Sequence, residues 1–481
     1  MLLSFVACAS DTGNPADTTK QSSETQTPGS NTGDITYEED DLPDDLKLDG
    51  MVINFIASSN DDKKTELFTE ELNSDIVNDS VYNREKYVEE RLDVEINPIL
   101  VPFGGIATEI EKMMGSDDDM YQICAHATSD FTELVFKDYF RDLYELDYIN
   151  FDKPWWSQAF NEEAEIMDKL YVTTGSLALS LTRYMFAIFY NKGLAADHAA
   201  DYPELGELYD IVERGDWTYD KFYELGNTIY IDNNGDNLKD DEDTYGIGFQ
   251  SCIGADVIWS SFDINILSPN DDGWFDIDVP TEKLYSALEK IHTLLYDTTG
   301  CFNAGTNDND LNVLSAMFSS DNLLFMNNEL LAIESVTLRN MQSDYGILPF
   351  PKYDKKQDNY YSLPMDWYTT FAIPKTTQNP DAAAAVLEAL ASYSYRETMP
   401  AYFDIALKGK YMSDPQSRKM LDLVVDGFMV DAAWIYYKTI GAGFPSTFRP
   451  SSNTSYASEY SKAVNRLKIK LTGYKVASKF S

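Results

Sequence analysis

The order of apolar and polar stretches predicts a chain that alternates between strands and helices. Residues 51–57 form an apolar run of strand length, and it ends in the polar sequence Ser58-Ser-Asn-Asp. The predicted elements that follow are a helix over 64–96, a strand over 94–101, a helix over 105–114 and a strand over 121–125. Such alternation is typical of α/β layers in which helices flank a mostly parallel sheet.

Polar residues follow two of the predicted strands directly. Ser58, Ser59 and Asn60 come after the first strand, and His126 comes after the strand at 121–125. In open α/β sheets, ligands bind beyond the carboxyl ends of the strands. We therefore expect these four residues at the functional edge of a sheet.

The second half of the chain contains two clear helix signals and no internal repeat. Asn379-Pro-Asp precedes an alanine-rich stretch, with Asn as the N-cap and Pro at the first helical position. Residues 455–471 have the pattern of an amphipathic helix with a basic end. No run of about twenty apolar residues exists, so no membrane-spanning helix is predicted.

The first residues resemble the end of a bacterial lipoprotein signal peptide. Residues 1–8 combine a short apolar stretch with the small residue Ala7 and then Cys8, the order of a truncated lipobox in which Cys8 is acylated. Residues 9–47 are rich in Ser, Thr, Asp, Gly and Pro and predict a disordered acidic tether. This order predicts a lipid anchor followed by a flexible tether.

Charge and cysteine content exclude several classes of protein. The chain has 37 basic and 81 acidic residues, a formal charge of −44, which argues against nucleic acid as a partner and against direct binding to anionic lipid. Besides Cys8, only Cys124, Cys252 and Cys301 remain, so at most one disulfide is possible. No CxxC or Cys/His spacing suggests a zinc site.

An acidic stretch at 232–243 has the spacing of a calcium-binding loop. Oxygen ligands are expected at positions 1, 3, 5, 9 and 12 and a backbone carbonyl at position 7, which gives Asp232, Asn234, Asp236, Asp240, Asp243 and Leu238. Two positions depart from the pattern, because Asn237 replaces the usual Gly and Asp243 replaces the usual Glu. The alternatives are a structural Ca²⁺ clip and an acidic turn without metal.

Aromatic residues are abundant, whereas enzyme motifs are absent. Sugar-binding sites combine aromatic platforms with polar side chains, and the candidate platforms are Trp155, Trp156, Trp217, Trp259, Trp274, Trp367 and Trp434. The sequence contains no GxSxG elbow, Walker A motif, HExxH or dinucleotide fingerprint. The three histidines are far apart in sequence, which favours structural roles.

Several blocks of sequence, in order, resemble the family-1 extracellular solute-binding proteins, which include the maltose-binding proteins. These blocks are Ile123-Cys-Ala-His-Ala, Phe140-Arg-Asp-Leu-Tyr-Glu-Leu, Asp152-Lys-Pro-Trp-Trp, Asp168-Lys-Leu-Tyr-Val-Thr-Thr-Gly-Ser, Phe189-Tyr-Asn-Lys-Gly, Gly215-Asp-Trp-Thr-Tyr-Asp-Lys-Phe, Met317-Phe, Phe325-Met-Asn-Asn, Asp344-Tyr-Gly-Ile-Leu-Pro-Phe-Pro-Lys and Phe371-Ala-Ile-Pro-Lys. The resemblance extends over essentially residues 50–470.

The resemblance implies a two-lobed periplasmic-binding-protein-like fold of type II, with a mostly parallel sheet in each lobe. Residues 48–175 and 328–395 are expected to form the first lobe, and residues 176–327 and 396–481 the second. It also implies a non-enzymatic, monomeric subunit of an ABC transporter. That subunit would be lipid-anchored on the extracellular face of the cytoplasmic membrane and would bind a sugar or oligosaccharide between lobes that close about a hinge.

The resemblance further implies positions for ligand-binding residues. Matches at strand ends and crossover segments give Ser59, Asn60, His126, Ser176, Trp259, Asn327, Glu329, Asp366 and Trp367. Trp259 is the preferred stacking platform, and Trp367 is a second source of an aromatic ring. Two other functions stay open: a secreted carbohydrate-active enzyme with a calcium clip, and a protein that binds peptides or other solutes on the same scaffold.

Overall fold

The structure of the chain is a computed structural model that describes residues 37–306, 310–403, 415–451 and 456–477. All elements below belong to one compact unit within residues 38–481. The predicted lipidation site Cys8 and residues 9–36 of the predicted tether lie outside the described residues. No helix in the described ranges is long and apolar enough to cross a membrane.

The first sheet has the strand order β12-β3-β1-β2. Its strands are β1 (Met51–Ser58), β2 (Val94–Val101), β3 (Ile123–Ala127) and β12 (Thr369–Ala372). Because β2 and β3 both pair with β1 in parallel, three carboxyl ends meet at one edge. β12 is antiparallel to β3, so it begins at that same edge. The strand prediction at 51–57 is confirmed, and the strands at 94–101 and 121–125 are confirmed within a few residues.

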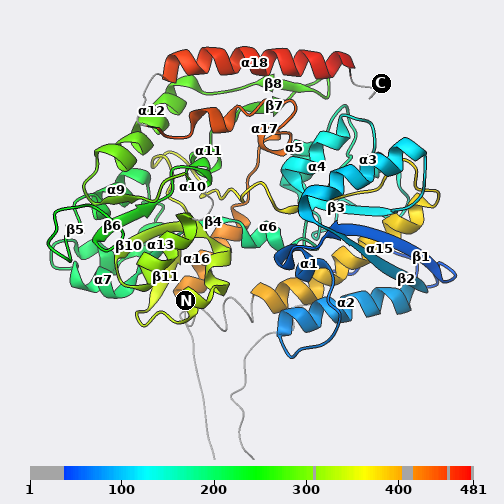
Figure 1. Cartoon of the computed structure of the whole chain (residues 1–481), viewed down its shortest axis with the longest axis horizontal. Coiled ribbons are helices and arrows are strands. Elements are labelled where there is room, and N and C mark those ends of the chain that lie inside the picture. The colour runs from blue at the N-terminus through cyan, green and yellow to red at the C-terminus, as the bar shows by residue number, and fades with distance from the viewer. Residues whose placement is uncertain (1–36, 307–309, 404–414, 452–455, 478–481) are drawn as a thin grey trace, which may run out of the picture. The chain divides into compact units, whose positions relative to one another are not determined.

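Helices of the first sheet connect its strands and cover its faces (Figure 1). They are α1 (Asp61–Leu67), α2 (Ile76–Leu92), α3 (Ile106–Ser116), α4 (Thr128–Val135), α5 (Gln158–Ala164) and α15 (Pro380–Tyr393). α2 and α15 pack against each other. α15 begins after Asn379 with Pro380 at its first position, as predicted.

The single helix predicted over 64–96 is wrong, because the chain breaks between α1 and α2. Ser74 has a left-handed φ of 69° that no helix accepts, and the Asp75 carboxylate then caps α2 by accepting from the amides of Val77 and Asn78. At its other end, α2 stops at Asp93, whose φ of 50° turns the chain into β2. The local turn chemistry therefore overrides the helical spacing.

The second sheet contains parallel and antiparallel pairs. Its path is β11-β4-β10-β6-β5, and β9 pairs with β6 off this path. The strands are β4 (Phe186–Asn191), β5 (Tyr230–Ile231), β6 (Thr244–Phe249), β9 (Cys301–Asn303), β10 (Leu323–Glu329) and β11 (Tyr345–Leu348). β10, β6 and β9 are parallel, whereas β4, β11 and β5 join as antiparallel strands. The mostly parallel arrangement expected for both lobes therefore holds for the first sheet alone.

Helices of the second sheet come from the middle of the chain. They are α7 (Lys192–Asp197), α8 (Leu208–Glu213), α9 (Tyr219–Gly226), α10 (Ile253–Asp256), α11 (Ile258–Ser261), α12 (Thr281–His292), α13 (Asp310–Ser319), α14 (Val336–Arg339) and α16 (Pro415–Asp426). A two-stranded sheet of β7 (Leu267–Pro269) and β8 (Phe275–Ile277) stands apart from them. α18 (Tyr456–Ala477) runs along this hairpin and includes residues 456–471 of the helix predicted over 455–471, of which Ser455 lies outside the described residues (Figure 1).

Two expected lobe boundaries need correction. β11 falls within the range 328–395 assigned to the first lobe, yet it pairs with β4 of the second sheet over Tyr345–Leu348. The return to the first sheet therefore follows Leu348. Likewise α17 (Ala432–Ile435), in the range assigned to the second lobe, packs on α4 and α5. Both errors arise because the pairing partners lie far away in sequence.

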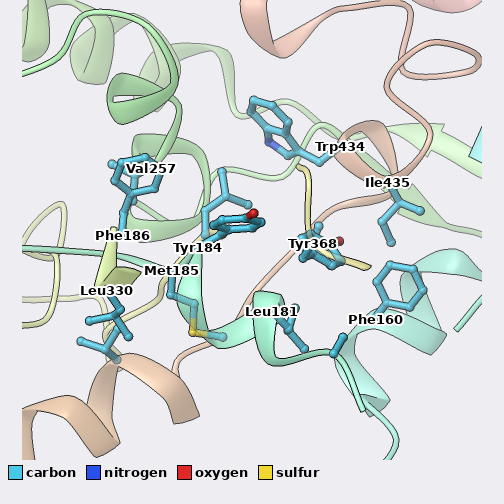
Figure 2. Close-up of a cluster of buried hydrophobic side chains, with 14 of the residues drawn as sticks. Phe160, Leu181, Tyr184, Met185, Phe186, Val257, Leu330, Tyr368, Trp434 and Ile435 are labelled. Carbon is cyan, nitrogen blue, oxygen red and sulfur yellow. The ribbon is translucent and has the colours of Figure 1, made fainter. Parts of the chain in front are cut away.

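A buried cluster lies where the chain passes between the two sheets (Figure 2). α6 (Leu179–Arg183) precedes Tyr184 and Met185, which lead directly into β4. Tyr184, Met185, Tyr368 and Trp434 are each at most 5% exposed and bring together three distant segments. This apolar packing fixes the connection between α6 and the second sheet.

The ordered chain begins earlier than the predicted tether allowed. Leu42 is 6% exposed and belongs to the hydrophobic core, while the amide of Leu48 donates to Leu92 at 2.7 Å. Residues 38–47 were predicted as part of a tether over 9–47, and this portion is docked. Burial of Leu42 and ion pairs of its acidic neighbours hold it, which a composition-based reading cannot detect. All three described cysteines, Cys124, Cys252 and Cys301, are free.

Candidate functional site

The carboxyl ends of β1, β2 and β3, together with the start of β12, form an edge that we call the first-sheet edge. Ser58, Val101 and Ala127 end their strands there, and Thr369 begins β12 opposite Ala127. Residues just beyond these positions carry side chains past the end of the sheet. They are the ones that a solute would meet at this edge.

Three rings gather at the first-sheet edge, although His126 lies within β3, paired with Thr370, and not after the strand as expected. Phe103 follows β2 in a short 3₁₀ turn, and its ring centroid lies 4.9 Å from that of His126 and 5.6 Å from that of Trp367. His126 is 4% exposed and Phe103 is half-buried, whereas Trp367 is 42% exposed. We call Phe103, His126 and Trp367 the aromatic group. It presents a large indole face to solvent from a packed base.

Backbone hydrogen bonds hold the loop that carries Trp367. The amide of Ser129 donates to the carbonyl of Asp366 at 3.2 Å, and the amide of Thr128 donates to the carbonyl of Tyr368 at 3.0 Å. The Thr128 hydroxyl also donates to the Tyr368 carbonyl at 2.9 Å. The start of α4 therefore clamps the residues on both sides of the indole.

Charged groups border the aromatic group. Asp130 lies in the first turn of α4, 3.9 Å from His126 Nε2, and pairs with Lys438. Asp366 is half-buried next to Trp367, and burial raises its pKa, although its contacts with Ser129 and Arg449 act in the opposite direction. Carboxylates beside an exposed ring are well placed to accept hydrogen bonds from hydroxyl groups.

Ser59 and Asn60 lie at the same edge, directly after β1. Both are exposed. The amide of Ser59 donates to the Val101 carbonyl at 2.8 Å, and the amide of Asn60 donates to Ser58 Oγ at 3.2 Å. Asn60 is the N-cap of α1, and its side chain makes no capping hydrogen bond.

The carboxyl ends of β6, β9 and β10, with the start of β4, form the second-sheet edge. Asp256 at the end of α10 is 5% exposed and accepts from Arg449 Nε at 2.9 and 3.0 Å. Burial raises the pKa of Asp256 to about 6, and the Arg449 ion pair limits this rise. The charge of Arg449 also acts on Asp366. One guanidinium thus connects acidic residues of both edges.

The structure places the remaining predicted site residues in the interior or in the crossover. Trp259 is 2% exposed and packs on Phe444 and Phe448 with centroids 6.2 and 6.0 Å away, so in this conformation it offers no free face for stacking. Asn327 is 1% exposed and donates to the Gly254 carbonyl at 2.9 Å. Its role is to hold α10 at the end of β10.

Glu329 and Ser176 are also held by local structure. Glu329 is 7% exposed, and its amide donates to the side chain of Asn328 at 2.8 Å. Ser176 is half-buried, and its amide donates to the Trp155 carbonyl at 2.9 Å. Of the nine predicted residues, His126, Asp366 and Trp367 therefore come together most closely.

Sequence reasoning missed several residues of the site. Phe103 and Asp130 lie next to the predicted residue His126, Lys438 pairs with Asp130, and the charge of Arg449 acts on Asp366, yet none of the four belongs to a recognisable motif. Phe103 carried a usable signal, because it follows a predicted strand just as Ser59 does. Lys438 and Arg449 carried no such signal, because their partners Asp130 and Asp256 lie 308 and 193 residues away in sequence.

The predicted calcium loop has part of the geometry that it needs. Asn237 adopts a left-handed φ of 63° at the position where such loops usually carry Gly. The Asp232 carboxylate accepts from the amides of Gly235 at 2.7 Å and Asn237 at 3.0 Å, so it folds the loop inward. Within the described ranges, no three His, Cys, Asp or Glu side chains are grouped to hold a metal ion. Calcium binding by this loop stays a prediction.

Comparison with known protein families identifies the family of the chain. The model of a family described as bacterial extracellular solute-binding protein matches residues 65–397, more than half of the chain. The chain belongs to this family. The resemblance drawn from the sequence blocks is thereby confirmed. A search of curated proteins found no match to the sequence.

Solved structures similar to this solute-binding protein share its fold. The galacto-N-biose-/lacto-N-biose I-binding protein of Bifidobacterium longum, in complex with lacto-N-biose, has a TM-score of 0.56 at 11% identity, covering 89% of this chain and 98% of that one. A cyclo/maltodextrin-binding protein with maltotetraose has a TM-score of 0.54 at 13% identity, covering 87% and 97%. An ABC substrate-binding protein of Listeria monocytogenes with cycloalternan gives 0.51 at 13%, covering 89% and 98%. The predicted two-lobed type II fold is confirmed.

Proposed function

We propose that this solute-binding protein captures a sugar or an oligosaccharide for an ABC importer. The observation that carries the proposal is the aromatic group, in which Trp367 is 42% exposed next to Asp366 and Asp130 lies 3.9 Å from His126. A sugar ring has an apolar C–H face that stacks on an indole and a rim of hydroxyl groups that donate to carboxylates. The sugars bound in the similar structures lend support to this class of ligand.

The proposed mechanism is closure on the ligand. A sugar stacked on Trp367 would also reach residues of the second-sheet edge, where Arg449 already acts on Asp366. Ligand contacts made to both edges favour the closed state only by the amount that this state binds more tightly. A micromolar site needs about 8 kcal/mol, which a few stacked rings and hydrogen bonds can supply.

The proposal extends to location and partners. Lipid attachment at Cys8 would hold a monomeric protein on the outer face of the cytoplasmic membrane, where ABC permease subunits receive its ligand. The ligand would be released unchanged, without catalysis. The loop 232–243 would bind Ca²⁺ as a structural clip, remote from chemistry.

A glycan panel tests the proposal directly. Calorimetry with maltotetraose, lacto-N-biose, cycloalternan and other neutral oligosaccharides should give saturable binding of at least one ligand. Small-angle scattering should then show a smaller radius of gyration, and chromatography should recover the ligand intact. An absence of binding and compaction across the panel would sink the proposal, and release of a cleaved product would favour the enzyme alternative.

A further inference from the structure

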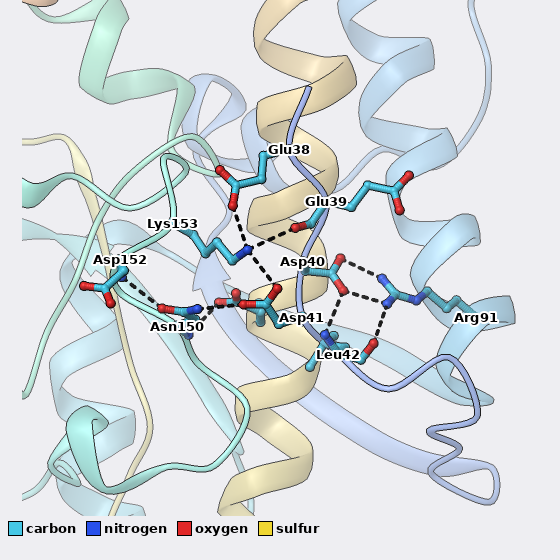
Figure 3. A network of polar contacts seen from close by, with 10 residues as sticks. Glu38, Glu39, Asp40, Asp41, Leu42, Arg91, Asn150, Asp152 and Lys153 are labelled. Carbon is cyan, nitrogen blue, oxygen red and sulfur yellow. Dashed lines mark hydrogen bonds and ion pairs between the residues drawn. The ribbon is translucent and has the colours of Figure 1, made fainter. Parts of the chain in front are cut away.

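A short acidic strap docks on the first-sheet side of the molecule (Figure 3). We define the strap as residues 38–42. Arg91 Nη1 and Nη2 donate to Asp40 at 2.7 and 2.6 Å, and Lys153 Nζ pairs with Glu38 at 2.7 Å and Asp41 at 2.8 Å. With Leu42 buried beneath them, these contacts turn the strap into one wall of a cavity.

The cavity has a volume of about 460 Å³ and an acidic lining. Asp41, Asp147, Asp152 and Glu388 line it, and its lining contains no lysine or arginine. Lys153 neutralises Asp41 from behind the strap. Among the described residues, no ion pair is formed by Asp147, Asp152 or Glu388. The cavity therefore carries uncompensated negative charge.

Glu388 is the most unusual of these groups. Its side chain is 1% exposed, and its Oε2 accepts from Trp156 Nε1 at 2.9 Å and from the amide of Asn150 at 3.4 Å. Its Oε1 and Nε1 of Trp155 are both buried without a hydrogen bond of normal length, and a hydrogen-bond contact with Trp155 still acts to lower the pKa of Glu388. Burial raises the pKa of Glu388 to about 7. A buried carboxylate whose second oxygen is held only by the contact with Trp155 keeps capacity to accept from a further donor at the cavity wall.

Aromatic rings complete the lining. Tyr144 is 44% exposed at the cavity and lies edge-on to Phe151 with centroids 5.4 Å apart. Phe151 in turn lies 5.5 Å from Trp156, whose indole donates to Glu388. Ring faces next to carboxylates attract ammonium and guanidinium groups through cation–π contact and ion pairing.

We propose that this cavity is a second binding site, distinct from the aromatic group, and that it takes an organic cation with an ammonium or guanidinium head. The donor hydrogens of such a head satisfy Glu388 Oε1, and its charge balances Asp147 and Asp152. A free amine and a lysine or arginine side chain of a protein share this chemistry. A metal ion fits less well, because within the described chain no three acidic, His or Cys side chains are grouped to hold one.

Occupancy of the cavity is coupled to the strap. Asp41 and Leu42 belong to both, and Asn150 Nδ2 donates to Asp41 at 2.7 Å from the opposite wall. A cation in the cavity therefore stabilises the docked strap, and release of the strap removes one wall. This inference does not rest on sugar capture, since none of the cavity residues belongs to either sheet edge.

Titration of the full chain with matched probes tests the site. Benzylammonium should bind saturably at low ionic strength, whereas benzyl alcohol, of the same shape without the charge, should not. The double variant Asp147→Asn/Asp152→Asn should weaken benzylammonium binding by about five- to tenfold, because two exposed carboxylates each contribute modestly. Both residues are exposed, so the variant should fold normally.

Controls separate the site from general acidity. Asp45→Asn removes a single charge from an exposed residue near the strap that does not line the cavity, and it should leave binding unchanged. If acetyl-lysine methylamide binds with the same affinity as benzylammonium, the natural ligand is a protein side chain. If benzylammonium alone binds, the natural ligand is a small amine. Equal binding of benzyl alcohol, equal loss in Asp45→Asn, or no saturation by either cation would overturn the proposal.

Discussion

The two sheet edges use the same kinds of residue in opposite ways. At the first-sheet edge, Trp367 is 42% exposed and rests on half-buried Phe103, while at the second-sheet edge Trp259 is 2% exposed and packs against Phe444 and Phe448. Charge follows the same division, since Asp130 is partly accessible and Asp256 is almost fully buried with Arg449. One edge is suited to meeting a solute and the other to holding the fold.

Trp259→Ala should give the largest effect, and it should fall on stability. Removing a buried indole leaves a cavity between two phenyl rings and costs about 3–5 kcal/mol of the free energy of unfolding. Urea unfolding followed by circular dichroism measures this loss. The matched variant Trp367→Ala should cost under about 1 kcal/mol, because its ring is largely solvated. Equal costs for the two variants would break the contrast between the edges.

Arg449→Met should destabilise the protein in a pH-dependent manner. Burial already holds the pKa of Asp256 at about 6, above its ordinary value, so this group lowers stability as pH rises from about 4 through 6. Without Arg449 the pKa rises further, and ionised Asp256 is left without its partner. We expect a loss of about 2–3 kcal/mol at pH 8, below that of a fully buried pair because Arg449 is 30% exposed.

The difference between the Arg449→Met variant and the native protein should shrink towards pH 4, where Asp256 is protonated in both. Unfolding curves at pH 4, 6 and 8 give the comparison. Arg466→Met, which removes an exposed arginine that contacts Thr447, is a control that should show no such trend. A constant difference across this range would argue against the role assigned to Asp256.

Trp367→Ala should affect ligand binding more than stability. Loss of a stacking face weakens a carbohydrate complex by about 1–2 kcal/mol, or roughly five- to thirtyfold in Kd. Calorimetry with the best ligand of the glycan panel measures the change, and Trp367→Phe should restore part of the affinity. An unchanged Kd in Trp367→Ala would show that the ligand does not stack on Trp367 at the first-sheet edge.

Particular residues show which parts of the fold can be predicted from the sequence. β1, β3 and the start of α15 follow from local rules, namely an apolar run and the Asn379-Pro pair. The break at Ser74 was missed because a single left-handed residue leaves the helical spacing intact. β11 was assigned to the wrong sheet because its antiparallel pairing with β4 depends on a contact about 150 residues away.

The candidate site was predictable in part. His126, Asp366 and Trp367 were found through the resemblance to a family, and the structure brings them to one edge. Trp259 was preferred as a platform because it follows a strand, yet sequence does not report that Phe444 and Phe448 cover it. Exposure of an aromatic ring depends on long-range packing, and for this reason tryptophan positions alone did not identify the platform.

Calcium should produce the smallest effect. With the affinity of extracellular calcium modules, about 10⁻⁴–10⁻³ M, 2 mM Ca²⁺ should stabilise the protein by about 1 kcal/mol, and Mg²⁺ should not. Thermal unfolding with calcium and with a chelator measures the shift.

Asp232→Ala should abolish the calcium-dependent shift, because Asp232 occupies the first ligand position and also organises the loop through Gly235 and Asn237. Asp241→Asn, an exposed loop residue outside the ligand pattern, should keep the shift. This loop lies at the turn between β5 and β6, on the opposite end of β6 from the second-sheet edge, so calcium should leave sugar affinity unchanged. If Asp232→Ala lost sugar affinity together with the calcium-dependent stabilisation, the loop would belong to the binding site instead.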